Sequence, residues 1–192
     1  MSYDIVLFRP RPGEDPLTTA HCEDEGIERE GSQPDPAKEA LKQSVMSALM
    51  DANPSLEPFE VKYEQIAQFE NISVEEAKLR YRHIELNGPE DGNGIQILLD
   101  DDEASVSVPY WHDGAKAEST LKELWEYLTI IQRETGYVVY DPQLDMILDL
   151  SQGYSEALNV YAGTRQAVVQ RMPSVVLQSE GKPQKRWWQF WK

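Results

Sequence analysis

The fold is decided by residues 95–110, IQILLDDDEASVSVPY. Ile95, Ile97 and Leu99 stand at every second position, and Val106, Val108 and Tyr110 do the same on the returning run. A period of two indicates strands with one buried face. The acids between the two runs, Asp100 to Glu103, are expected to form a solvated turn. The stretch therefore predicts a β-hairpin.

The regions outside the hairpin supply further strands and helices. Helix starts are indicated by Asp35-Pro36, with Asp as cap and Pro in the first turn, and by a capping box at Ser73. Residues 59–70 fit either a short helix or an irregular strand. The strands expected besides the hairpin are 3–8, 82–86, 137–140 and 146–150, and the helices are 36–52, 74–81, 114–134 and 154–171.

This order of elements predicts an α+β fold. Short links between neighbouring strands favour a mainly antiparallel sheet, with helices packed on one face. Residues 1–172 are expected to form a single domain. Within it, residues 13–34 hold many acids and few large apolar residues, which predicts a disordered, mobile loop. Residues 173–192 are interpreted as a linker and a flexible tail.

Composition narrows the cellular setting. The chain has 192 residues, a formal charge of −16 and one cysteine, Cys22. A single cysteine provides no internal disulfide. The chain has no run of roughly 18 apolar residues and no basic start followed by a long apolar run, so we expect a cytoplasmic protein.

The charge is divided unevenly along the chain. Every acid precedes Gly181, so residues 1–181 carry −20 and residues 182–192 carry +4. An acidic body repels nucleic acid, so no nucleic-acid partner is expected. It favours a basic protein partner, and the partner-binding residues expected in the body are Asp100, Asp101, Asp102, Glu103, Glu23, Asp24 and Glu25.

The basic tail also holds three of the five tryptophans. Cations beside indoles suit a membrane interface, and tryptophans also serve as anchors in a partner's groove. Alternatively, the tail folds back onto the acidic body and covers an apolar patch. The tail anchor residues in all three interpretations are Lys185, Arg186, Trp187, Trp188 and Trp191.

The sequence shows no catalytic apparatus, and no metal or cofactor is expected. The spacing of Asp100–Glu103 is not that of a calcium loop, which alternates oxygen ligands around a central glycine. His112 and Asp113 could form a general-base pair. We instead expect Asp113 to cap the helix that follows, because neighbouring side chains rarely face each other on a strand.

Two segments, Ser2–Pro10 and Glu134–Gln143, resemble segments of small acidic uncharacterised bacterial proteins, some of them similar to immunity proteins of polymorphic toxin systems. The resemblance and the acidic body together favour a non-catalytic inhibitor of a cognate toxin, such as a basic nuclease. The alternative is a peripheral membrane or adaptor protein tethered by its tail. An enzyme that uses His112 is the third hypothesis.

Overall fold

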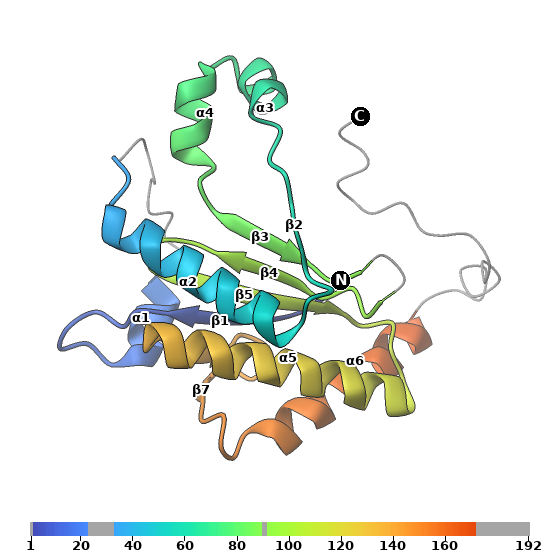
Figure 1. Ribbon diagram of the computed structural model, residues 1–192. Coiled ribbons are helices and arrows are strands. Elements are labelled where there is room, and N and C mark those ends of the chain that lie inside the picture. The colour runs from blue at the N-terminus through green and yellow to red at the C-terminus, as the bar shows by residue number, and fades with distance from the viewer. Residues whose placement is uncertain (1, 23–32, 90–91, 172–192) are drawn as a thin grey trace, which may run out of the picture.

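One antiparallel sheet organises the computed structural model, which describes residues 2–22, 33–89 and 92–171 (Figure 1). Its seven strands lie in the order β2-β3-β4-β5-β1-β6-β7. The strands are β1 (Ser2–Phe8), β2 (Glu57–Pro58), β3 (Ile84–Asn87), β4 (Gln96–Leu99), β5 (Glu103–Pro109), β6 (Val138–Asp141) and β7 (Met146–Leu148). The α+β prediction is confirmed.

The first strand occupies the middle of the sheet. β1 pairs with β5 on one side and β6 on the other, with Ile5 opposite Val106 and Leu7 opposite Val139. All four of these side chains are fully buried. The predicted hairpin is confirmed as β4 and β5, in which Ile97 faces the same valine.

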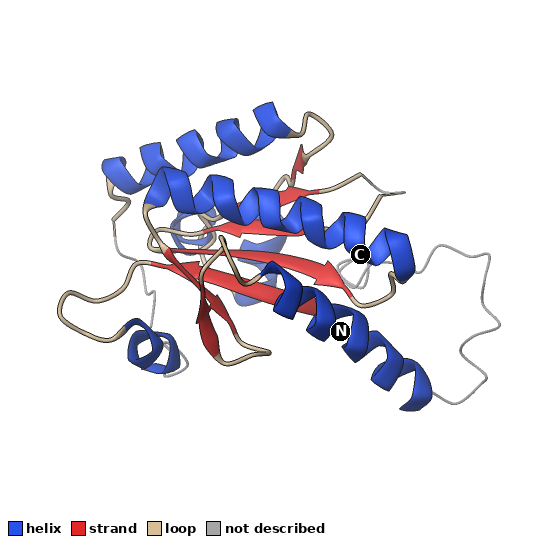
Figure 2. Cartoon of the chain, turned by 90° about the horizontal axis from the view of Figure 1, so that it is seen from below, coloured by secondary structure: helices blue, strands red, loops and turns tan. Residues whose placement is uncertain are grey.

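Three helices cover the apolar face of this sheet (Figure 2): α2 (Pro36–Ala52), α5 (Gly114–Thr135) and α6 (Tyr154–Arg171). The Asp35 side chain accepts a hydrogen bond from the Ala37 amide, so α2 begins at its predicted cap. The buried side of α5 includes Leu121, Leu124 and Leu128, which join strand residues in one core. These leucines follow the three- and four-residue spacing that predicted the helix.

Two short helices form a projection at the β2–β3 edge of the sheet (Figure 1): α3 (Tyr63–Glu70) and α4 (Val74–Arg80). We call residues 63–80 the arm. Residues 59–70, which left two interpretations open, thus contain a helix. The Ser73 hydroxyl accepts from the Glu76 amide, as the capping box predicted.

The prediction of a disordered loop over residues 13–34 is wrong in part, because Pro16–Cys22 forms helix α1. Asp15 accepts a hydrogen bond from the Thr18 amide, and the Thr19 side chain is fully buried. His21 contacts Asp145 at 2.7 Å, which ties the helix to the β6–β7 turn. Composition gives no sign of the contact between His21 and Asp145, which are 124 residues apart in the sequence. Residues 23–32 lie outside the described residues.

No helix in the described ranges is long and apolar enough to cross a membrane.

Candidate partner-binding surface

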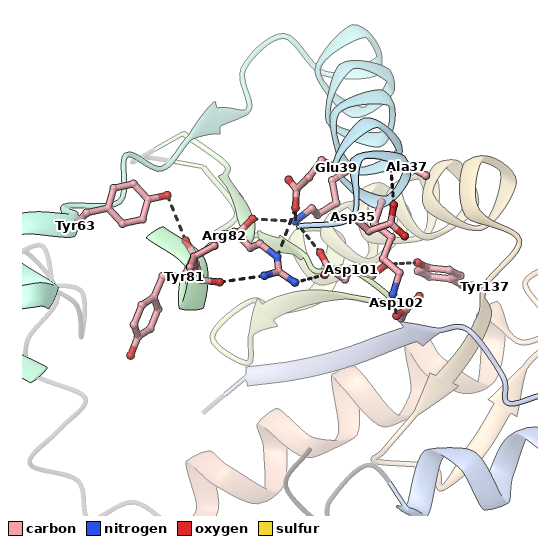
Figure 3. Close-up of polar contacts among 12 residues, drawn as sticks. Asp35, Ala37, Glu39, Tyr63, Tyr81, Arg82, Asp101, Asp102 and Tyr137 are labelled. Atoms are coloured by element: carbon pink, nitrogen blue, oxygen red, sulfur yellow. Dashed lines mark hydrogen bonds and ion pairs between the residues drawn. The ribbon is translucent and has the colours of Figure 1, made fainter. Parts of the chain in front are cut away.

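The acids Asp100 to Glu103, which we call the acidic tip, lie where β4 turns into β5, against the start of α2 (Figure 3). The turn is closed by a hydrogen bond from the Asp100 amide to the Glu103 carbonyl, 2.8 Å long. Asp102 is exposed, whereas the other three acids are half-buried. The tip is therefore less solvated than its composition suggested.

Asp101 belongs to a charge network that includes a buried lysine. Its carboxylate lies 3.0 Å from Nζ of Lys42, whose side chain is 3% exposed. The same Nζ contacts Glu39 at 2.9 Å and donates to the Arg82 carbonyl at 3.0 Å. The Arg82 guanidinium donates to the second oxygen of Asp101 (Figure 3). Asp101 thus joins the hairpin to α2 and to the segment before β3.

This environment changes the acidity of Asp101. Burial alone would raise the pKa of its carboxyl, but hydrogen bonds from Arg82 and Lys42 outweigh burial and lower the pKa to about 2. Positive neighbours favour the ionised form, and the network holds the carboxylate as an anion.

The other tip acids also have partners within the chain. Asp102 pairs with Lys38 and, at 3.4 Å, with Nε of Arg9. Asp100 and Glu103 likewise make interactions with the rest of the protein. The solvated-turn prediction is wrong in part: the turn is present and Asp102 is exposed, but cations distant along the chain pack against the tip and partly bury the other three acids. Partner binding through these residues stays a prediction.

The remaining predicted binding residues lie outside the described residues. They are Glu23, Asp24 and Glu25 of the acidic loop and Lys185, Arg186, Trp187, Trp188 and Trp191 of the tail.

Other carboxylates are more accessible than those at the tip. We use the name open carboxylates for exposed acids whose side chains make no ion pair or hydrogen bond within the part of the chain that the structure describes. They are Asp51, Glu57, Glu60, Glu64, Glu75, Glu118, Glu126 and Glu156. Four of them follow one another from the end of α2, through β2, to the start of α3. The sequence does not distinguish them from other acids, because it does not show which acids pair with cations in the folded chain.

A large concavity runs along α5. This groove, which we call the α5 groove, has a volume of about 1050 Å³. A polar cluster lies on its lining: the Asn53 amide donates to Glu123 at 3.0 Å and to the Tyr127 hydroxyl at 2.6 Å. Asn93 also donates to Glu123. Burial, reinforced by the hydrogen bond to Glu123, raises the pKa of the Tyr127 hydroxyl. The cluster ties three segments together and uses its hydrogen-bonding groups internally.

His112 has a structural contact. Its side chain is buried, and Nε2 lies 2.6 Å from the Asn93 carbonyl oxygen. Asp113 occupies the cap position of α5, where its carbonyl accepts from the amides of Lys116 and Ala117; its side chain makes no capping hydrogen bond. Asp113 thus stands at the predicted cap position, but its side chain does not make the capping hydrogen bond that we expected.

Within the described ranges, no group of three or more His, Cys, Asp or Glu side chains could hold a metal ion.

Comparisons with protein-family models, with curated proteins and with solved structures give no match to this chain.

Proposed function

We propose that the protein is a non-catalytic, immunity-type inhibitor that binds a basic bacterial toxin, such as a nuclease. The observation that carries the proposal is the set of open carboxylates, exposed acids that make no ion pair with the cations in the described part of the chain. Such a surface accelerates encounter with a basic partner and disfavours acidic ones.

The arrangement of the paired charges supports the same proposal. Arg82 and Lys42 stabilise the hairpin internally, so they do not offset the open carboxylates elsewhere. The run from Asp51 to Glu64 extends along the sheet edge and reaches the arm (Figure 1). We expect a partner to meet this edge first.

The test is a search for a toxin domain among the genes beside the one that encodes this chain, followed by co-expression of that domain with the chain. The wild-type chain should protect the cells and bind the purified toxin domain with an association rate that falls steeply with salt. Absence of protection and of binding at physiological salt would contradict the proposal.

Matched variants locate the surface. Glu57→Gln with Glu60→Gln should slow association about tenfold at low salt, because electrostatic steering sets the encounter rate. Glu75→Gln with Glu156→Gln removes the same charge from the arm and from α6, and should have a smaller effect. If both pairs of substitutions slowed association equally, the net charge of the protein would steer the partner, and not the sheet edge that carries Glu57 and Glu60.

A further inference from the structure

The chain ends in a segment with its own chemistry. Residues 182–192, KPQKRWWQFWK, hold four cations, three tryptophans and no acid. We call these residues the tail; they lie outside the described residues. Three indoles left in water would form an apolar patch of the kind that promotes association. A surface that can take both indoles and cations would remove this cost.

The α5 groove offers both kinds of contact. Trp125, Ile130 and Tyr154 line it with aromatic and aliphatic surface. Glu118 and Glu126, two of the open carboxylates, lie on the same lining. Lys116 and Lys122 also line the groove, so apolar contact must supply part of any affinity. A volume of about 1050 Å³ is ample for indole side chains.

The groove has a rigid wall beside the start of α6. The Trp125 and Tyr154 rings meet edge to face with centroids 5.5 Å apart, and the Trp125 indole donates to the Leu150 carbonyl at 2.9 Å. The Tyr154 hydroxyl donates to the Glu118 carbonyl at 3.3 Å. These contacts hold the first turn of α6 against α5, so the lining is preformed.

The connecting chain is long enough to bring the tail back to this wall. Helix α6 has 18 residues and runs roughly 27 Å from Tyr154 to Arg171. Residues 172–181 between α6 and the tail can span up to roughly 35 Å when extended. The tail can therefore return along α6 to the groove. A short tether also keeps its local concentration in the millimolar range.

We propose that the tail binds in the α5 groove of its own chain, with its tryptophans against the apolar lining and its cations beside Glu118 and Glu126. In this arrangement the tail shields its own indoles. The inference is independent of the proposed toxin partner.

The experiment places a nitroxide spin label on the tail of the full-length chain and records its effect on backbone amides by NMR. Gln189→Cys carries the label in a Cys22→Ser background, which leaves every tryptophan in place. Amides of residues 116–130 should be broadened strongly, and those of α4 should not. An absence of broadening along α5 would overturn the proposal.

A matched pair of charge reversals tests the contact chemistry. Glu118→Lys with Glu126→Lys should lower the docked population about fivefold, because two favourable charge contacts become repulsive. Glu64→Lys with Glu75→Lys makes the same charge change on the arm and should leave the broadening unchanged. Equal effects of the two pairs would contradict a specific groove.

Two further measurements test the alternatives, in which a second copy of the chain fills the groove or a membrane binds the tail. In the first, spin-labelled chain without ¹⁵N is mixed with ¹⁵N-labelled chain that carries no spin label. This mixture should give no α5 broadening; broadening would mean that a second copy supplies the tail. Vesicles of phosphatidylglycerol and phosphatidylcholine should sediment the Glu118→Lys, Glu126→Lys variant more than the arm variant, because undocking frees the tail. Equal sedimentation of these two variants would overturn docking.

Discussion

Lys42 is a charged residue buried at the edge of the core. Its ammonium group is tolerated because three oxygens surround it, from Glu39, Asp101 and the Arg82 carbonyl. A buried charge is stable only when it is paired and hydrogen-bonded. The network therefore makes Asp101 more important for stability than an ordinary turn acid.

Replacing Asp101 tests this assignment. Asp101→Asn should lower the free energy of unfolding by about 2 kcal/mol, because Lys42 and Arg82 would lose their shared anion. Asp102→Asn, at the exposed neighbouring position, should cost less than about 1 kcal/mol. Urea unfolding of both variants measures the difference. Equal costs would mean that Lys42 finds another partner.

The same carboxylate should make stability depend on pH. Its pKa falls from 3.8 in the free residue to about 2 in the fold, so the stabilisation is complete above pH 4 and is lost as the pH falls toward 2. Between pH 5 and pH 2.5 the wild type should therefore lose about 1 kcal/mol more than Asp101→Asn, after allowance for solvent screening. A constant difference between the two proteins would contradict this role.

At the residue scale, the sequence identifies charge but not its partners. The four tip acids stand out in the sequence, yet Lys42 and Arg82 are distant along the chain and reach Asp101 only through the packing of α2 on the sheet. The open carboxylates could not be identified from the sequence for the same reason. Which acids stay accessible depends on which acids pair with cations in the fold.

At the element scale, local signals define the helices that have them. Helix α5 ends at Gly136, whose φ of 69° lies in the left-handed region, as expected for a C-terminal glycine. Helices α2 and α4 begin at the caps that their sequences indicate. Helix α1 was missed because its stability comes from contacts with the sheet: seven residues are too short to form a helix alone.

Two glycines give opposite expectations for the same substitution. Gly136→Ala should destabilise the protein by about 1 kcal/mol, because an L side chain is strained at positive φ although nothing lies near its Cβ. Gly163→Ala, inside α6 and equally uncrowded, should stabilise by about 0.5–1 kcal/mol through helix propensity. Thermal unfolding of both variants measures the signs. A shift in the same direction would contradict one of the two backbone assignments.

At the scale of the whole molecule, the centre of the sheet and the arm differ in how they are held. β1 pairs on both edges and contributes Tyr3, Ile5 and Leu7 to the core. In the arm, by contrast, α3 and α4 bury one residue each, Ala67 and Ala77.

Native-state hydrogen exchange should separate these regions. Amides of the arm should exchange at least about a hundredfold faster than those of β1, because short helices with few buried side chains open locally. Low concentrations of urea should accelerate exchange in β1 far more than in the arm, since opening β1 exposes the core. Equal protection in both regions would show that the arm is held by the whole fold.

The sequence by itself determined the periodic elements of this protein: the β4–β5 hairpin, the long amphipathic helices and their caps. These depend on interactions between residues a few positions apart, and the α+β class follows from their order. Only the tertiary structure decided which charges neutralise one another, where α1 packs and how α5 forms a groove beside α6. Each of these depends on contacts between segments far apart in the chain, which no local pattern records.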